Sequence, residues 1–302
     1  MKKFCVLLMF VFLVFSFAFS QKEGQNEGFK FGFKYENFSY LSSLLKSFEL
    51  VNVSRYDWHM ITRLQRLQGE ESVSRLLFQT SYSSQIFRLI AIVGVGSLAY
   101  NYYQGAIQQE DKTVGGWSGE SEKDYDLVPF EQKSNLGMVL GGEIDWSVKS
   151  DPFIIALNAR YLWQEEAQSN SNLFYDFGEG SAYLQYGYHL QQADIRKTAH
   201  TEFLVGMVFS KKFGNWVLSG GPKAVFLETT HKGIGHWESK FQNFQFSSSD
   251  SFRAENDFAI KIKNQGFFFL CHLGYEMNFA EAFVESRIGF ASGVSAGLNF
   301  KL

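Results

Sequence analysis

The chain has little of what fixes a fold covalently or signals familiar chemistry. Its 302 residues include two cysteines, Cys5 and Cys271, and only three prolines. Beyond the first 20 residues, no apolar run reaches the roughly 18 residues that a transmembrane helix needs. Lys and Arg number 28 against 31 Asp and Glu, so no basic excess points to a nucleic-acid partner. The absence of a His-Glu-x-x-His motif excludes the zinc proteases that carry it.

The N-terminus has the features of a secretory signal. Two lysines precede an apolar run from Phe4 to Phe19, and residues 18–20 (Ala-Phe-Ser) place small side chains where a signal peptidase cuts. We expect residues 1–20 to be removed, which leaves Cys271 alone and therefore no internal disulfide. Residues 21–302 are expected to form a single domain, because no internal repeat or low-complexity linker divides them.

Aromatic residues are abundant, since 33 Phe, 14 Tyr and 6 Trp make up 18% of the chain. They alternate with polar residues at a period of two, which predicts strands with one apolar and one polar face. In 267–279, for example, the side chains of one face are all apolar and include Cys271. The other such segments are 28–36, 135–148, 153–163 and 203–209. This alternation fits a membrane β-barrel, where Cys271 would face lipid, and it also fits a soluble β-sandwich.

Strand length and loop order favour the barrel. Several segments run for about ten residues or more, the length that a tilted strand needs to cross a bilayer. Short connections at 149–152, 211–215 and 278–282 alternate with polar tracts at 104–134, 165–200 and 229–262. We therefore predict an all-β, antiparallel transmembrane barrel of the outer membrane, with short turns at one end and long loops at the other.

The number of strands depends on the C-terminal segment. A tight reversal at 291–293 gives about ten strands, whereas one unbroken strand over 282–302 gives about eight, and we favour ten. The region 41–85 fits either strand, turn and strand or one long strand with an insertion, and 86–103 is predicted to be strand. The polar residues predicted to face the lumen are Glu143, Asp145, Asn158 and Arg160.

Two of the six histidines, His231 and His236, stand five residues apart in the polar tract 229–262. A zinc site needs a third protein ligand, and no spacing in the sequence supplies one. For a single Asp or His in a polar loop the usual place is the solvated surface. The spacing therefore disfavours a metal site, and a position on the loop surface and a role in catalysis remain the alternatives for this pair.

Several segments together resemble the omptins, outer-membrane endopeptidases shaped as ten-stranded barrels. The segment "VSRYDW" (53–58) resembles the family's second-strand motif, although a second Val-Ser-Arg at 73–75 competes for it. Further similarity lies in "VGVGSLAYNYYQGAIQQEDK", "GGWSGES", the hairpin "SNLGMVLGGEIDWSVKSDPFIIALNARYLWQEE", "VFSKKFGNWVLSGGPKAVFLETTHKGIGHWES" and the closing "VSAGLNFKL". The resemblance covers most of the chain after the signal and is weakest over 59–85.

The resemblance implies a catalytic site at the barrel mouth. In omptins an Asp-x-Asp pair faces an Asp-x-His pair, and a water between them attacks the peptide carbonyl. The His position falls on His236, while the Asp expected two residues earlier is Ile234. The Asp-x-Asp pair falls on Gln109 and Asp111. His236 and Asp111 are thus the candidate catalytic residues, with two of four positions lost, and His231 is predicted to lie at the surface.

Other carboxylates in the sequence are candidates for the missing positions. Asp124 and Asp126 have the spacing of an Asp-x-Asp pair, but they lie farther along the same tract. Glu110 or Glu228 is a candidate replacement for the carboxylate lost at Ile234. An imidazole without such a partner lacks a fixed tautomer, which costs about 10⁴ in rate in a triad.

Three hypotheses follow from the sequence. The first is an omptin-like endopeptidase that cuts peptides or proteins near basic residues, without a cofactor but with the lipopolysaccharide that omptins require. The second is the same barrel without catalysis, which serves as an adhesin, a structural protein or a surface-binding protein. The third is a small pore, which the side chains that fill a barrel of about eight to ten strands disfavour.

Overall fold

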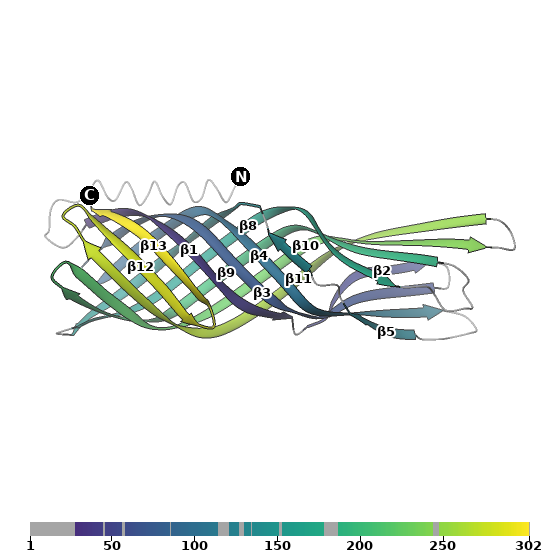
Figure 1. The fold of residues 1–302 in the computed structure, drawn as a ribbon, viewed down its shortest axis with the longest axis horizontal. Coiled ribbons are helices and arrows are strands. Elements are labelled where there is room, and N and C mark those ends of the chain that lie inside the picture. The colour runs from purple at the N-terminus through teal and green to yellow at the C-terminus, as the bar shows by residue number, and fades with distance from the viewer. Residues whose placement is uncertain are drawn as a thin grey trace.

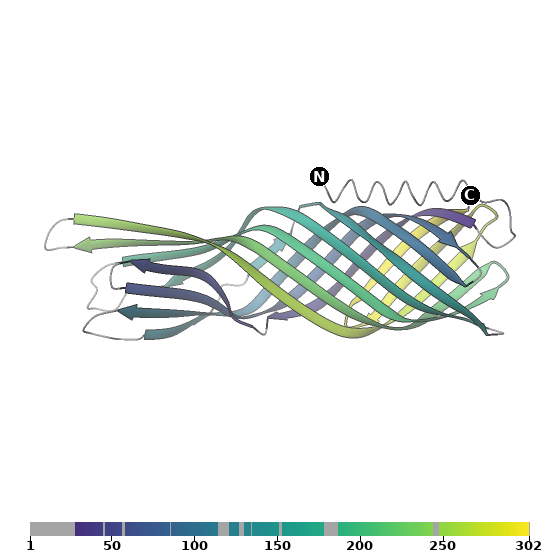
Figure 2. The ribbon, with the colours of Figure 1, turned by 180° about the vertical axis from the view of Figure 1, so that it is seen from behind.

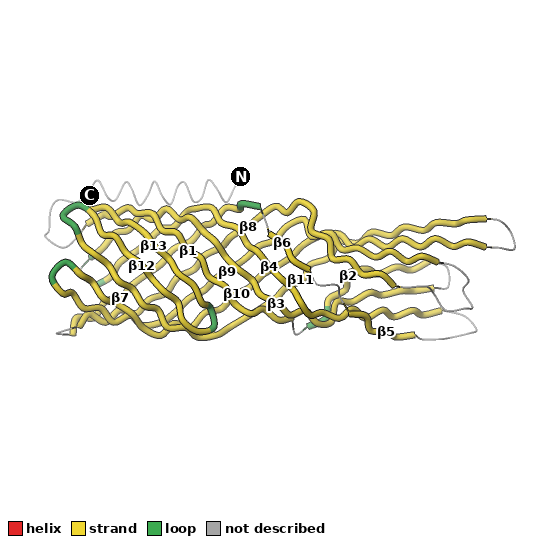
Figure 3. The backbone as a smooth tube through the Cα atoms, viewed as in Figure 1, coloured by secondary structure: helices red, strands yellow, loops and turns green. Residues whose placement is uncertain are grey.

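The computed structural model describes residues 28–44, 46–55, 58–84, 86–113, 121–126, 130–133, 135–150, 153–177, 187–243 and 248–301. The expected signal, residues 1–20, lies outside this part of the chain. Within it, thirteen strands join in one antiparallel sheet, and Figure 3 shows strand almost throughout. No helix in these segments is long and apolar enough to span a membrane.

The strands differ greatly in length. Their bounds are β1 Gly28–Leu44, β2 Phe48–Arg55, β3 Trp58–Ser83, β4 Phe87–Thr113, β5 Ser121–Asp126, β6 Phe130–Lys133, β7 Gly137–Ser150, β8 Phe153–Phe177, β9 Gly187–Phe213, β10 Trp216–Asn243, β11 Ser248–Glu276, β12 Ala280–Gly289 and β13 Ser292–Lys301.

Ten of these strands close into a ring. The order of pairing is β3, β1, β13, β12, β11, β10, β9, β8, β7 and β4, and β4 pairs back with β3. Figures 1 and 2 show the tilted strands of this barrel from opposite sides. The prediction of an antiparallel barrel of about ten strands is confirmed. The reversal between β12 and β13 falls at Phe290 and Ala291, slightly earlier than the sequence indicated.

The predicted short turns after β7, β9 and β11 lie at one end of the barrel, whereas the two-residue β12–β13 reversal lies at the other end. The β9–β10 turn is Gly214-Asn215, and the β11–β12 turn occupies 277–279. Gly214 has a φ of 58°, a conformation that favours glycine because it has no Cβ. Of the predicted turn at 149–152, residues 151 and 152 lie outside the described residues.

The polar tracts predicted as long loops are largely strand instead. β10 runs for 28 residues and β11 for 29, far more than the roughly 9–11 that cross a bilayer. The excess length builds an extension beyond the barrel, which Figure 1 shows on the side opposite the short turns. The prediction was wrong here because polar residues also form strands when neighbouring strands supply partners for their backbone groups.

In the extension the barrel wall divides into two four-stranded layers. One layer is β8–β9–β10–β11, and the other is β2–β3–β4–β5. The region 41–85 forms the end of β1, the β2–β3 hairpin and the long β3, close to the first alternative from the sequence. Of the two Val-Ser-Arg segments, 53–55 lies in β2, whereas 73–75 lies in β3 and pairs with β1 in the barrel wall.

The barrel wall is apolar outside and polar inside. Its outer face carries many exposed Phe, Leu, Ile, Val, Met, Tyr and Trp side chains, from Phe33 on β1 to Leu298 on β13. Its inner face buries charged residues such as Glu36, Arg75 and Glu202. A soluble protein would reverse this pattern, so the chain has the fold of an outer-membrane β-barrel. Cys271 lies on the exposed outer face, as predicted.

Candidate functional site

The candidate catalytic histidine lies in the extension, on the middle part of β10. Along this strand the residues His231, Gly233 and Gly235 are buried, while Lys232 is exposed and His236 is partly exposed. Because successive side chains alternate between the faces of a strand, His236 belongs to the outer face. It therefore points away from the space between the two layers of the extension.

His236 contacts two carboxylates from neighbouring strands. Its Nε2 lies 2.9 Å from Asp194 Oδ2 on β9, and its Nδ1 lies 3.2 Å from Glu255 Oε1 on β11. Asp194 thus provides a carboxylate next to the imidazole although Ile234 replaces the expected aspartate. Which ring nitrogen carries the proton depends on the tautomer. All three side chains are at least a quarter exposed, at 29%, 28% and 65% for His236, Asp194 and Glu255.

The two glutamates that were candidates for this partnership bind elsewhere. Glu110 forms an ion pair with Arg63 at 3.1 Å, and Glu228 forms one with Lys261 at 2.7 Å. Asp194 was missed because it is 42 residues from His236 in the chain. A β-bulge at Lys232 and Gly233 shifts the β9–β10 register between the barrel and this contact, which no spacing in the sequence signals.

Asp111, the second candidate, lies near the end of β4, where its backbone pairs with Met60 and Ser121. Its side chain is outside the described residues, as is that of Gln109. Asp124 and Asp126 belong to β5, and their side chains are also outside the described part. A contact between Asp111 and His236 therefore stays a prediction.

The space between the two layers of the extension is filled by apolar side chains. Leu50, Leu64 and Ile107 from one layer share a buried cluster with Ile195 and Ile260 from the other. All five are at most 2% exposed. These buried groups are apolar and therefore differ from the acidic groups that a water-activating site needs.

Strand β2 lies directly against the inner face of β10. A Cβ built on Gly235 would lie 2.2 Å from the Leu50 carbonyl oxygen, so only glycine permits this approach. Asn256 Nδ2 donates a hydrogen bond of 2.9 Å to the Asn52 carbonyl oxygen, which ties β2 to β11 as well. Strand β2 therefore packs against the inner side of β10 and β11 in the extension.

His231 is not at the surface, so the sequence-based prediction for it was wrong. It is 1% exposed, and its ring lies between Tyr102 Oη at 3.1 Å and Thr198 Oγ1 at 2.9 Å. Its odd position on β10 directs it inward, and two hydroxyl groups satisfy both of its ring nitrogens. A buried histidine of this kind needs no ligand to explain it.

A second buried histidine, His200, lies in a cluster of polar side chains in the lumen. Glu71 stands at its centre and accepts hydrogen bonds from Tyr40 Oη at 2.6 Å and Thr229 Oγ1 at 2.8 Å. His200 Nδ1 lies 3.1 Å from the same Thr229 hydroxyl. Glu71 and His200 are at most 1% exposed, so these groups hold the wall together and are closed to a large substrate.

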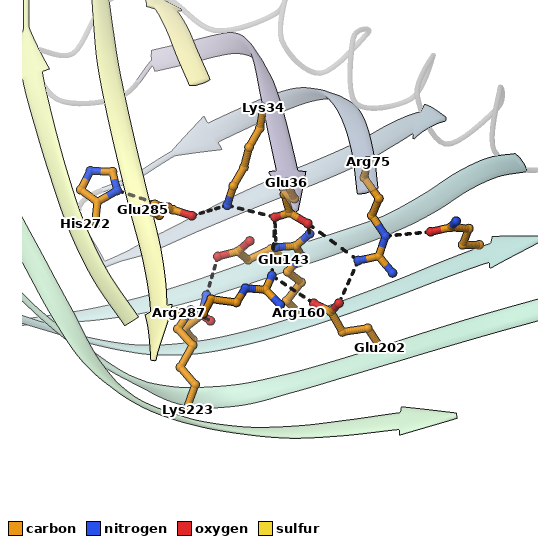
Figure 4. A network of polar contacts seen from close by, with 12 residues as sticks. Lys34, Glu36, Arg75, Glu143, Arg160, Glu202, Lys223, His272, Glu285 and Arg287 are labelled. Carbon is orange, nitrogen blue, oxygen red and sulfur yellow. Dashed lines mark hydrogen bonds and ion pairs between the residues drawn. The ribbon is translucent and has the colours of Figure 1, made fainter. Parts of the chain in front are cut away.

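An ion-pair network fills the lumen nearer the short turns (Figure 4). Glu36 is its central anion, bound by both terminal nitrogens of Arg160 at 2.6 and 2.8 Å and by Lys34 at 3.1 Å. Arg75 approaches Glu36 at 3.7 Å and pairs with Glu202 at 2.8 Å.

The network reaches across the lumen to other strands. Lys34 also pairs with Glu285, which lies 3.2 Å from His272 Nδ1. Arg287 joins Glu36 and Glu202 at 3.7 and 3.5 Å. Because long charged side chains from opposite walls meet in the middle, they occupy the space that a pore would need.

The four residues predicted to face the lumen do so. Asn158 Nδ2 donates to Glu143 and Asp145, both at 2.6 Å, and Asn158 Oδ1 accepts from Lys223 Nζ at 2.5 Å. Arg160 binds Glu36, as described. Among the described residues, no three His, Cys, Asp or Glu side chains are arranged to hold a metal ion.

Comparisons with known proteins give little beyond strand architecture. No protein-family model matches the chain, and a search among curated proteins gave no match. Among solved structures, the β domain of the Bordetella autotransporter BrkA is 10% identical, with a TM-score of 0.32 over 91% of this chain and 99% of that one. An outer membrane channel from Pseudomonas putida F1 is 11% identical, with a TM-score of 0.24 over 94% and 100%. The toluene transporter TbuX from Ralstonia pickettii is 8% identical, with a TM-score of 0.24 over 92% and 90%. At these TM-scores the assignment of the barrel depends on the strand pairings and on the apolar outer wall described above.

Proposed function

We propose that this protein is an integral outer-membrane barrel without peptidase activity, whose closed extension serves as a structural or adhesive surface outside the cell. The observation that carries the proposal is the packing of the extension. Its two layers enclose an apolar core, and β2 lies against Gly235, where a peptide substrate would have to enter. A rigid, strand-built projection suits binding at its outer face, as edges and faces of sheets do in other recognition modes.

The membrane location is part of the same proposal. Large apolar side chains such as Leu157, Phe209 and Phe269 lie 42–53% exposed on the outer wall, which water would disfavour and lipid would accept. Short turns of outer-membrane barrels face the periplasm and longer elements face outward. The extension is accordingly placed on the outer side of the cell.

Lipopolysaccharide is the partner that we propose at the outer rim of the barrel. Lys197 on β9 and Lys232 on β10 are directly opposed partners, a like-charge arrangement that the ion pair of Lys197 with Glu165 at 2.7 Å offsets in part. Lys261 and Lys263 lie on β11, where Glu228 contacts both, at 2.7 and 3.7 Å. On their strands these lysines lie on the extension side of the exposed rings of Phe203, Phe226 and Phe267, where we expect lipid phosphates to meet the protein. Phosphate groups would relieve the repulsion between the opposed lysines.

The endopeptidase remains a second candidate, because Asp194 places a carboxylate 2.9 Å from His236. In that hypothesis His236 takes the proton of a water, Asp194 orients the imidazole, and Asp111 holds the water from the other side. The outward direction of His236 and its separation from the apolar core speak against it, since substrate and water would be exposed to bulk solvent.

One experiment separates the two candidates. Refolded protein with lipopolysaccharide is incubated with peptides that contain paired basic residues, beside the variants His236→Ala, Asp194→Asn and Asp111→Asn. We expect the same background cleavage from all four. Cleavage by the wild type that falls at least a hundredfold in the His236→Ala and Asp111→Asn variants would establish the peptidase and overturn the proposal.

A further inference from the structure

The lipid-facing wall is hollowed over β12 and β13. A groove of about 530 Å³ crosses these two shortest strands of the barrel. Its floor is made by Ala282 on β12 and Ala296 on β13, which are diagonal neighbours in successive cross-strand rows. The cross-strand partners of these alanines on the flanking strands are large. Tyr275 on β11 pairs with Ala282, and Tyr35 on β1 pairs with Ala296. The hollow therefore arises from two small side chains among large ones.

Aromatic rings form both sides of this groove. On one side Trp216 and Tyr275 pack edge to face, with ring centroids 4.9 Å apart. On the other side Phe33 and Tyr35 are each 48% exposed. No charged side chain is among the residues that line the groove in the described structure. Its chemistry suits a hydrocarbon and offers nothing to a charged or strongly polar ligand.

We propose that this groove holds an acyl chain of a phospholipid from the periplasmic leaflet. The groove is continuous with the lipid-facing wall, so hydrocarbon chains surround it. Trp216 directly follows the Gly214-Asn215 turn, which places that end of the groove at the membrane interface on the short-turn side. In the orientation given under the proposed function, the leaflet on this side is the periplasmic one. The inference rests on that orientation.

Packing explains why a chain would stay there. Apolar protein surfaces gain no hydrophobic free energy by leaving lipid, so dispersion contacts decide what fills a hollow in the wall. A slender, flexible chain reaches the alanine floor and contacts rings on both sides. A second copy of the barrel would present a convex wall that meets the rim of the groove before its floor.

Tryptophan quenching by brominated phospholipid tests the proposal. Two single-tryptophan proteins are prepared, in which either Trp216 or Trp146 is kept and the other five tryptophans are Phe. Trp146 is the matched control, because it is 60% exposed on the outer face of β7 and also lies near the short turns. In detergent, we expect brominated phosphatidylethanolamine to quench Trp216 at a severalfold lower lipid-to-protein ratio than Trp146.

Filling the floor provides the second arm. Ala296→Phe, in the Trp216 protein, should remove this preferential quenching, while Ala159→Phe on the outer face of β8 adds the same bulk elsewhere and should leave it intact. Equal quenching curves for Trp216 and Trp146 would overturn the proposal. Trp216 that stays unquenched in a protein shown to be dimeric by light scattering would also overturn it, in favour of a second copy. Stronger quenching by lipopolysaccharide with brominated chains than by phospholipid would reject the assigned leaflet.

Discussion

Removal of the central anion of the lumen network should destabilise the barrel strongly. Glu36 is fully buried, and four cations lie within 4 Å of its carboxylate: Lys34, Arg75, Arg160 and Arg287. Glu36→Gln keeps the shape of the side chain and removes its charge. It leaves these four cations with three nearby anions, Glu202, Glu285 and Glu143, so a buried positive charge is no longer compensated.

The expected size follows from the burial of the group. Breaking a buried ion pair by neutralising one partner costs about 3–5 kcal/mol. At about 1.4 kcal/mol per factor of ten, this lowers the folding equilibrium constant by roughly a hundredfold to several thousandfold. Glu228→Gln is the matched control, because that carboxylate is 34% exposed and pairs with Lys261 on the outer face. An exposed pair of this kind contributes about 0–1 kcal/mol.

Urea unfolding of the refolded protein in micelles, followed by tryptophan fluorescence, measures both free energies of unfolding. A double variant, Glu36→Gln with Arg160→Met, should lose less than the sum of the single losses, by about 0.5–3 kcal/mol, because the two side chains share one contact. If Glu36→Gln and Glu228→Gln shift the unfolding midpoint equally, then the network does not hold the lumen together and the reasoning is wrong.

Four further outcomes are expected. Gly235→Leu should force β2 away from β10 and expose the extension to limited proteolysis while the barrel stays resistant, since a Cβ would lie 2.2 Å from the Leu50 carbonyl oxygen; an unchanged digestion pattern would contradict the close packing. Gly214→Val should lower the stability by about 1–2 kcal/mol in urea unfolding, because φ at this turn is 58°, and an unchanged midpoint would refute the strain. Val205→Arg on the outer wall should cost about 2–4 kcal/mol of folding free energy in lipid vesicles, against about 0–1 for Phe213→Arg at the turn, and equal costs would argue against a lipid-facing wall. The wild type in a planar bilayer should show no stable pore current, and a steady conductance would show that side chains leave the lumen open.

The alternation of residues carried most of the fold. In 153–163 the apolar residues that face lipid and the polar Asn158 and Arg160 that face the lumen follow from a period of two, which is a local property of a strand. The same period continues through 267–279 and fixed Cys271 on the outer face. The tight turns also have local signals, such as the glycine at 214. These features need no knowledge of which strands become neighbours.

The polar tracts were harder to interpret. Residues 229–243 have the composition of a loop, and they are a strand because β9 and β11 lie on either side and pair with their backbone groups. Once the strand continues, the even residues stay outward from Phe226 to His236 and the odd residue His231 turns inward. Treating this tract as a loop hid that parity, and the prediction therefore placed His231 at the surface.

The sequence by itself determined that this chain forms long antiparallel strands with an apolar outer face, because that information repeats every second residue. Only the tertiary structure decided how the extension is packed. It brought Asp194 to His236 across 42 residues and a β-bulge, and it set β2 against Gly235 so that apolar side chains fill the space between the layers. Contacts of this kind depend on the register between distant strands, and register is set by the whole sheet and not by any one segment.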